Sequence, residues 1–269
     1  MKFEAFLINM KGNPERLAYM SRQLNNLGIP FAIQEGTDGK TYNFKNEYNE
    51  ALSKKLNGSV LSPGERGCAL SHRRILEKIL EEHVDYALIL EDDIELPGTF
   101  KGALDEVLRQ RASGETNWEY LAFNYPSVGI KFIRLWIFLL FEQFRKNPSI
   151  GLFLKIPIFC IKFFGISLFS AFEGIRDARF KKIYKYGKPA RFYRPLYLAG
   201  CYLVTNRGAQ KLLSINTKLV YAADRIQNVA RVKKGLKLFA FVPLLVKQRR
   251  DKFESTIYQN KNYQYEKYD

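Results

Sequence analysis

The apolar positions of the chain follow two alternating spacings, and this predicts strands that alternate with helices. Residues 3–9 (FEAFLIN) and 86–90 (YALIL) are short, largely apolar runs typical of buried strands. The second run is apolar on both faces, so we expect it to lie inside a parallel sheet. Between the two runs, apolar residues recur at helical spacing in Leu17, Met20, Leu24 and Leu27. Asn13 and Pro14 precede that run as the expected N-cap and first helical residue, and Gly28 follows it as a stop signal.

Further elements are expected along the rest of the chain. They are a strand at 31–34, a helix that starts at the Ser62-x-x-Glu65 capping box, a helix near 100–111, a strand near 119–124, a strand, turn and strand over 192–204, a short helix over 205–213 and a last strand over 236–246. We expect the polar stretch 36–58 to be loop. This order predicts a doubly wound α/β sheet of the Rossmann type, whose ligands bind at the carboxyl ends of the strands. Asn9 and the acidic run after residue 90 both stand at such ends.

Residues 128–190 interrupt the alternation with a basic, aromatic and mainly helical insertion. Residues 131–188 hold 12 Lys and Arg against 3 Asp and Glu, so that +9 of the total net charge of +16 falls in this segment. The longest uncharged apolar stretch, 163–172, has 10 residues, whereas a helix that spans a bilayer needs about 20. Two interpretations stay open: an interfacial segment on an anionic membrane, or a helical subdomain that packs on the sheet. The concentration of charge favours membrane contact.

Composition adds three points to this picture. A net charge of +16 and an isoelectric point near 9.6 favour anionic partners such as nucleic acid, an acidic membrane or phosphorylated substrates. The three cysteines are widely spaced, which argues against a disulfide framework or a zinc site and favours a reducing compartment. The N-terminus lacks the pattern of a signal peptide, so we expect a cytoplasmic protein with a single domain over 1–269 and a loosely held tail at 249–269.

The sharpest local feature is the acidic triplet Glu91-Asp92-Asp93, with Glu95 close behind it. Carboxylates at the end of a buried strand repel one another, so they need a cationic partner. Mg²⁺ or Mn²⁺ bound to diphosphate oxygens would supply it, because hard cations take oxygen ligands. Neighbouring side chains of a strand face opposite sides, so Asp93 is the first candidate metal ligand, with Glu91 or Glu95 in support. The structural alternative is an acidic strand end neutralised by a nearby Lys or Arg.

Three other candidate residues are ordinary when each is taken alone. His72 is one of two histidines, and a helical histidine is more often structural than catalytic. Asp224 is an isolated acid. Arg16 lies near an expected helix start, where an arginine is more often solvated than bound to phosphate. The order of these residues along the chain is what supports a functional role for them.

A series of short blocks occurs in a specific order. The blocks are Leu7-Ile8-Asn9, Glu15-Arg16, Thr37-Asp38-Gly39, Leu61-Ser62-x-Gly64-Glu65-x-Gly67-Cys68-Ala69-Leu70-Ser71-His72, Ala87-Leu88-Ile89-Leu90-Glu91-Asp92-Asp93 and Ala199-Gly200-Cys201-Tyr202-Leu203-Val204-Thr205-x-x-Gly208-Ala209. Together they resemble glycosyltransferase family 25, a family of bacterial lipooligosaccharide biosynthesis that is also related to collagen galactosyltransferases. The resemblance covers 3–124 and 192–248. Asp224 falls where the family carries an acid, with Ala223 before it in place of Pro or Val.

The resemblance implies a fold, a donor and a set of roles. It implies a nucleotide-binding domain of the GT-A type, a UDP-sugar donor, commonly UDP-galactose, and inversion at the anomeric carbon. The residues expected around the nucleotide are Asn9, Arg16, Asp38, Gly39, Ser71 and Asp92. Asp93, helped by Glu91, is expected to hold Mn²⁺ or Mg²⁺ on the diphosphate. Asp224 is the first candidate for the base that activates the acceptor hydroxyl, and His72 is the second, unless His72 holds the diphosphate instead.

The acceptor implied by the family is a lipid-linked saccharide, the core of a lipooligosaccharide or lipopolysaccharide. We therefore expect the enzyme to lie peripherally on the inner face of the cytoplasmic membrane, with the basic insertion on its anionic surface. Two alternatives remain. One is a non-catalytic relative that binds only the nucleotide-sugar, and the other is a nucleic-acid-binding protein, for which the chain has charge but no recognisable motif.

Overall fold

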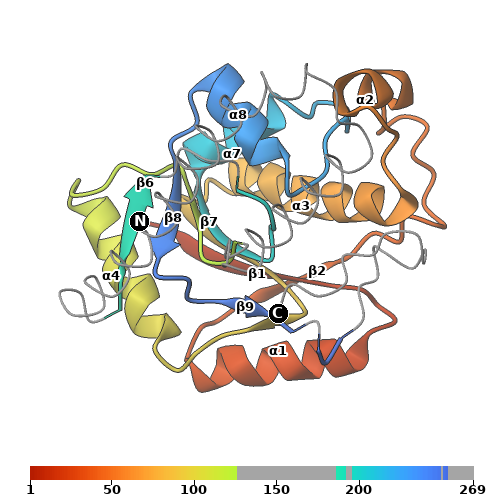
Figure 1. The fold of residues 1–269 in the computed structure, drawn as a ribbon. Coiled ribbons are helices and arrows are strands. Elements are labelled where there is room, and N and C mark those ends of the chain that lie inside the picture. The colour runs from red at the N-terminus through yellow and green to blue at the C-terminus, as the bar shows by residue number, and fades with distance from the viewer. Residues whose placement is uncertain (126–185, 192–195, 250, 254–269) are drawn as a thin grey trace, which may run out of the picture. The chain divides into compact units, whose positions relative to one another are not determined.

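The computed structural model describes residues 1–125, 186–191, 196–249 and 251–253, which build a central sheet with helices on both faces (Figure 1). The chain divides into two units, 1–126 with 186–261 and 127–185 with 262–269. All described residues belong to the first unit. The expected insertion at 128–190 therefore lies outside the described residues except for its end, and so does most of the expected tail at 249–269.

Seven strands form the main sheet. In spatial order they are β2 (Ala32–Glu35), β1 (Phe3–Asn9), β3 (Tyr86–Glu91), β7 (Cys201–Thr205), β5 (Tyr120–Ala122), β8 (Leu238–Val242) and β6 (Lys188–Arg191). Pairing is parallel for β1 with β2, β1 with β3 and β5 with β8. It is antiparallel wherever β7 or β6 takes part. A second, two-stranded ribbon pairs β4 (Ile94–Glu95) with β9 (Lys247–Gln248).

The predicted α/β fold of the Rossmann type is confirmed, with one difference in strand direction. We expected β3 to lie inside a parallel sheet because both of its faces are apolar. It pairs in parallel with β1 but antiparallel with β7. Burial on both faces comes from the helices that cover the sheet, whichever way the neighbouring strand runs, so the apolar pattern does not report strand direction. The range 192–204 was expected to hold two strands, and its described part, 196–204, contains one, most of β7.

Helices cover both faces of the sheet. They are α1 (Pro14–Asn26), α2 (Glu50–Asn57), α3 (Pro63–Glu81), α4 (Phe100–Ala112), α7 (Asn206–Leu213) and α8 (Ile226–Lys234). One apolar core contains side chains of α3, α7 and α8, and the other contains side chains of α1 and α4 (Figure 1). In β3, Ala87 and Ile89 point into the first core, whereas Leu88 and Leu90 point into the second.

Local signals place the ends of these helices. The predicted capping box of α3 is present, because the Ser62 hydroxyl accepts from the Glu65 amide at 3.2 Å and the Glu65 carboxylate accepts from the Ser62 amide at 2.7 Å. Helix α2 lies inside the stretch that we expected to be loop, so that prediction was wrong. Asn49 caps α2 by accepting from the Leu52 amide, and Gly58 ends it with φ of 78°. These two signals could have revealed the helix.

The loop after β2 touches the backbone of α3. The Thr37 amide donates to Ser71 Oγ at 2.8 Å, and the Ser71 hydroxyl donates to the Gly67 carbonyl at 2.8 Å. A side chain at Gly39 would overlap the carbonyl of Pro63, and one at Gly67 would overlap the carbonyl of Thr37. Both glycines are therefore needed for the close approach of two backbones.

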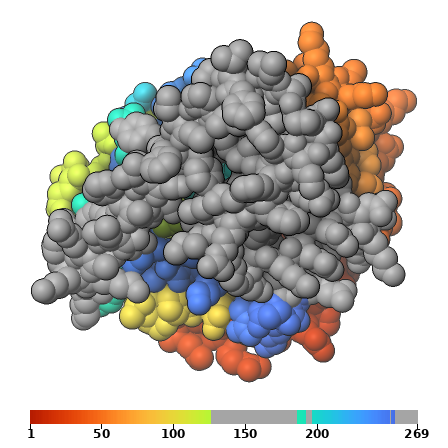
Figure 2. All heavy atoms as spheres, in the orientation of Figure 1, coloured from red at the N-terminus to blue at the C-terminus, as the bar shows by residue number. Residues whose placement is uncertain are grey.

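The start of the C-terminal tail contacts α1. The Phe253 ring lies edge-on to Tyr19 with ring centroids 5.3 Å apart, and the guanidinium of Arg16 lies 5.1 Å from its centroid. In the space-filling view, the blue segment before the C-terminus borders the red of α1 and the yellow of the segment that follows β3 (Figure 2). The described part of the tail, 249 and 251–253, is thus anchored on the protein.

Within the described ranges, no helix is both long enough and apolar enough to span a membrane. The described end of the expected insertion, 186–190, contributes most of β6, which pairs with β8 at the edge of the sheet.

The contact between the loop and α3 predicts that Gly67→Ala will destabilise the protein. The added methyl group must displace the carbonyl of Thr37, and forced overlap of this kind typically costs about 1–3 kcal/mol. Thermal and urea unfolding of both proteins measure the change. Gly12→Ala is the matched control, because a side chain at Gly12 meets nothing within 4 Å. Equal stability of the two variants would contradict this interpretation.

Candidate functional site

The site lies where the parallel strands β1 and β3 end side by side. The register pairs Ile8 with Glu91, so Asn9 and the Asp92-Asp93 turn follow at the same edge of the sheet. Three consecutive acids are gathered there, and both Asp92 and Asp93 are buried. Each of the three side chains is bonded to a different set of partners.

Asp92 connects three elements through its two carboxylate oxygens. Oδ1 accepts from Arg16 Nη1 at 3.0 Å, and Oδ2 accepts from Asn9 Nδ2 at 2.7 Å. Asn9 also donates to the carbonyl of Asn13, just before α1. Burial raises the pKa of Asp92, and the bonds from Arg16 and Asn9 oppose that rise. Asp92, Arg16 and Asn9 thus hold the start of α1 against the ends of β1 and β3.

Glu91 turns toward α3. Its Oε1 lies 3.2 Å from His72 Nε2 and 3.6 Å from Cys68 Sγ. The other ring nitrogen of His72, Nδ1, lies 2.9 Å from the Tyr202 hydroxyl, and the two rings are stacked. Both nitrogens of His72 are therefore engaged by protein groups. Burial, followed by the charge of Glu91, raises the pKa of the Cys68 thiol well above its ordinary value.

Asp93 is held by Gln248 of β9 and by Arg249, which follows it. Its Oδ2 accepts from Gln248 Nε2 at 2.8 Å, and its carbonyl accepts from the Arg249 amide at 2.7 Å. Its Oδ1 is buried and has no hydrogen-bond partner among the described residues. Burial and then the charge of Glu91 raise the pKa of Asp93 to about 6. This carboxylate is therefore costly to ionise as it stands.

These residues fit a hard divalent cation. A buried carboxylate oxygen without a donor beside a second carboxylate offers oxygen ligands that lack a positive partner. Arg16 bonds to Asp92. The structural alternative of a strand end neutralised by arginine thus holds for Asp92, while Asp93 and Glu91 could share a cation.

Asp224 joins this group from the loop before α8. The charge of Asp224 helps to raise the pKa of Cys68, and the charge of Glu91 helps to raise that of Asp224 after the larger effect of burial. The fold therefore brings Asp224 near Glu91 although more than a hundred residues separate them. Gln227 fixes the backbone there, because its Nε2 donates to the Asp224 carbonyl at 2.7 Å.

A family model described as "Glycosyltransferase family 25 (LPS biosynthesis protein)" matches residues 2–227, most of the chain. The chain belongs to glycosyltransferase family 25.

Curated relatives of this family 25 protein include some named as galactosyltransferases and some named as inactive. Over 124 residues it is 31% identical to procollagen galactosyltransferase 1-B of Xenopus laevis. This match covers 44% of this chain and 20% of the relative. It is 26% identical over 134 residues to procollagen galactosyltransferase 2 of Mus musculus, and this match covers 48% of this chain and 21% of the relative. It is 25% identical over 131 residues to the inactive glycosyltransferase 25 family member 3 of Homo sapiens, covering 46% and 22%. The matched part spans about a fifth of each relative's length.

Three expected nucleotide-binding residues of the family 25 chain lie in the contact between the loop and α3. Asp38 is exposed, and its Oδ1 accepts from the Lys40 amide at 2.8 Å. Gly39 packs against Pro63, and the hydroxyl of Ser71 is occupied by two backbone groups. The contacts of Gly39 and Ser71 account for these residues structurally, and their role toward a nucleotide stays a prediction.

Sequence reasoning missed several members of the site. Tyr202 and Cys68 stand within the family blocks, but neither was given a role. The spacing of Cys68 and His72, four residues apart on one helix, was the available signal. Gln248, the partner of Asp93, comes from a two-residue strand more than a hundred residues away, and no local pattern indicates it.

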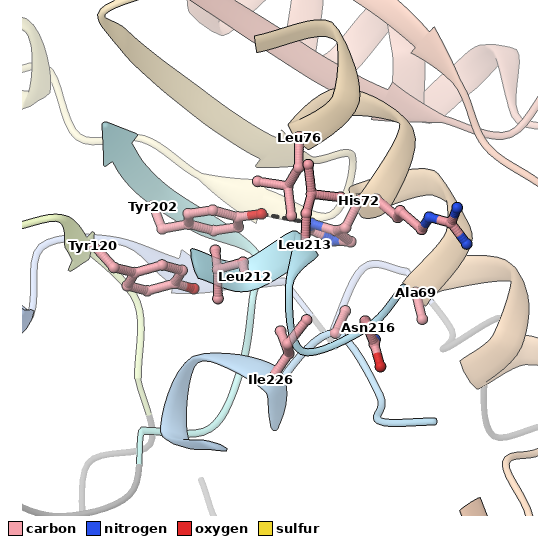
Figure 3. Close-up of a pocket in the computed structure, with 11 residues that line it drawn as sticks. Ala69, His72, Leu76, Tyr120, Tyr202, Leu212, Leu213, Asn216 and Ile226 are labelled. Atoms are coloured by element: carbon pink, nitrogen blue, oxygen red, sulfur yellow. Dashed lines mark hydrogen bonds between the residues drawn. The ribbon is translucent and has the colours of Figure 1, made fainter. Parts of the chain in front are cut away.

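A small cavity lies behind His72, between α3, α7 and α8 (Figure 3). Leu76, Tyr202 and Ile226 are among the side chains that line it. Its volume of about 20 Å³ suffices for about one water molecule, whereas small-molecule sites typically measure about 300–1,000 Å³. This cavity is therefore too small to be a sugar or nucleotide site.

The raised pKa of Asp93 predicts that Asp93→Asn will stabilise the family 25 protein at neutral pH. The folded value of about 6 exceeds the ordinary 3.8, so the folded chain holds this proton more tightly than the unfolded chain does. Wild-type stability should then fall as the pH rises from about 4 to about 6. Asparagine avoids that loss and can still accept from Gln248. We expect a gain of about 1–3 kcal/mol above that range and none below it.

Urea unfolding of both proteins across this pH range measures the difference. Asp105→Asn is the control, because Asp105 is exposed and pairs with Lys101 on the surface of α4. A difference between wild type and Asp93→Asn that does not change with pH would contradict the assignment.

Proposed function

We propose that this protein is an inverting glycosyltransferase that moves a hexose, galactose in the first place, from a UDP-sugar to a hydroxyl of a lipooligosaccharide or lipopolysaccharide core. The observation that carries the proposal is the environment of Asp93 in a chain of family 25. Its buried Oδ1 has no donor among the described residues, and it lies beside Glu91 at the carboxyl edge of the sheet. Donors bind at this edge in sheets of this type.

Asp93 and Glu91 would hold Mn²⁺ or Mg²⁺, which when bound offsets the charge of the donor diphosphate and of the departing UDP. The protein's own residues prepare the position. Asp92 is held by Asn9 and Arg16, so the turn that carries Asp93 is fixed from the side of α1. We expect Asn9 and Arg16, with the loop of Asp38 and Gly39 that Ser71 supports, to border the nucleotide.

Asp224 is the proposed general base. In the reaction, the acceptor oxygen bonds to the anomeric carbon, the bond from that carbon to the diphosphate breaks, and the acceptor proton passes to a carboxylate. The pKa of Asp224 is raised, chiefly by burial, and this suits a group that must accept a proton near neutral pH. His72 is the second candidate, but its ring nitrogens already bond to Glu91 and Tyr202. That favours a positioning role for His72.

The alternative proposal is a non-catalytic relative that binds nucleotide-sugar, since a relative named as inactive matches this chain too. The intact acidic triplet favours the enzyme. A measurement of turnover separates the two.

A metal-dependent UDP-release assay tests the proposal directly. We expect release with Mn²⁺ from one of UDP-galactose, UDP-glucose or their N-acetyl forms in the presence of a core-saccharide acceptor. Asp93→Asn should lose at least about 100-fold in kcat/KM, because the variant lacks the carboxylate that holds the metal, while Asp105→Asn keeps wild-type activity. Failure to bind UDP by calorimetry, with or without metal, would overturn the proposal. UDP binding without turnover would favour the non-catalytic alternative.

Asp224→Asn separates the base from the metal ligand. Loss of a general base should lower kcat by about 10²–10⁴-fold while leaving the metal-dependent affinity for UDP close to that of the wild type. Calorimetry with UDP and steady-state kinetics measure the two quantities. A normal kcat for Asp224→Asn with a large loss for His72→Gln would transfer the role to His72.

We further propose that the enzyme works on the inner face of the cytoplasmic membrane. Support comes from the sequence, in which residues 131–188 carry 12 Lys and Arg against 3 Asp and Glu. We expect binding to vesicles with anionic lipids at low salt and release at high salt, because the attraction is electrostatic. Co-sedimentation measures it. Equal binding to neutral vesicles, insensitive to salt, would contradict this part of the proposal.

A further inference from the structure

Three potential metal ligands of different chemistry meet between α3 and the end of β3. They are the thiol of Cys68, the imidazole of His72 and the carboxylate of Glu91, and their ligand atoms all lie within 4.8 Å of one another. Cys68 and His72 are four residues apart, so they project from the same face of α3. Glu91 comes from the neighbouring strand and completes the group.

The two distances from Glu91 to the other ligand atoms match those around a tetrahedral metal ion. Zinc bonds of about 2.3 Å to sulfur and about 2.0–2.1 Å to nitrogen or oxygen place neighbouring ligand atoms about 3.3–3.6 Å apart. Glu91 Oε1 lies 3.2 Å from His72 Nε2 and 3.6 Å from Cys68 Sγ. An ion could therefore replace the protons that link Glu91 to His72 and to Cys68.

The surroundings also suit a metal-bound histidine. Such a histidine usually bonds through its other ring nitrogen to an outer partner that fixes its orientation. His72 Nδ1 lies 2.9 Å from the Tyr202 hydroxyl, and the dashed line in Figure 3 marks this bond. Tyr202 is itself held by stacking on Tyr120, with centroids 4.5 Å apart. His72 Nε2 is thus directed at Glu91 and Cys68.

We propose that Cys68, His72 and Glu91 form a binding site for a soft or borderline divalent cation of the Zn²⁺ class. Sulfur and imidazole ligands select such ions over Mg²⁺ and Mn²⁺, which prefer oxygen. The wide cysteine spacing argues only against a zinc site built from several thiols. Here one thiol is joined by an imidazole and a carboxylate. Cys68 is half-buried and the Glu91 side chain is 22% exposed, which leaves an approach from solvent.

Cobalt titration tests the site without any assay of activity. Co²⁺ bound to a thiolate gives a near-ultraviolet charge-transfer band, and competition with Zn²⁺ gives the zinc affinity. We expect the band in the wild type and its loss in Cys68→Ser, with zinc affinity lowered by more than about 100-fold, since a lost ligand costs more than a lost outer partner. Tyr202→Phe should keep the band and weaken zinc binding by about 10-fold.

Two control variants test whether the cobalt band arises from this site. Cys201→Ala removes a buried cysteine of the opposite core and should keep the band, and Asp93→Asn should keep it as well. Excess Mg²⁺ should not displace the cobalt. Absence of the band in the wild type, or its persistence in Cys68→Ser, would overturn the proposal.

A measurement on the unaltered protein covers the case in which Cys68→Ser fails to fold. Peptide mass spectrometry should show that Zn²⁺ slows alkylation of Cys68, and an unchanged rate would count against the site. A further consequence, inhibition of sugar transfer by Zn²⁺ through Glu91, rests on the proposed function. A protein that shows the cobalt band but no transfer with any donor would keep this site and lose the proposed function.

Discussion

Mutual repulsion of the carboxylates at the end of β3 is the constraint around which this part of the molecule is arranged. Buried carboxylates that lie close together are stable only when each accepts hydrogen bonds or pairs with a positive charge. Asp92 bonds to Arg16 and Asn9, Glu91 bonds to His72, and Asp93 bonds to Gln248. The pKa of Asp93 stays raised even so. The pKa of Asp92 is raised as well, so compensation is incomplete at both aspartates, but the buried oxygen that has no donor among the described residues belongs to Asp93.

The mixed direction of the sheet is what brings the partners of Glu91 together. Strand β7 runs antiparallel beside β3, and the register places Ile89 opposite Tyr202. The side chain of Tyr202 therefore enters the core that α3 covers, where its hydroxyl meets His72. In a sheet that was parallel throughout, another residue would face α3 at this point. Strand direction and the environment of the histidine are consequently linked.

The sequence predicts the parts of the site that depend on local patterns. The apolar run of β3, the capping box of α3 and the place of Asn9 and the acidic triplet at strand ends follow from local patterns, and the structure confirms them. The antiparallel β7 and the partner of Asp93 depend on pairing between distant segments, which no local pattern specifies. Helix α2 was missed for another reason: its caps were present, but its eight residues lie in a polar stretch.

The ribbon of β4 and β9 makes the acid cluster depend on the end of the described chain. Gln248 and Arg249 bond to the side chain and the carbonyl of Asp93, across a sequence separation of about one hundred and fifty residues. During synthesis on the ribosome, β1, β3 and the helices between them emerge long before these two residues do. A nascent chain can thus assemble β1, β2 and β3 before the hydrogen-bond partners of Asp93 have been made. The hydrogen bond from Gln248, which opposes the rise in the pKa of Asp93, forms only after residue 248 has been made.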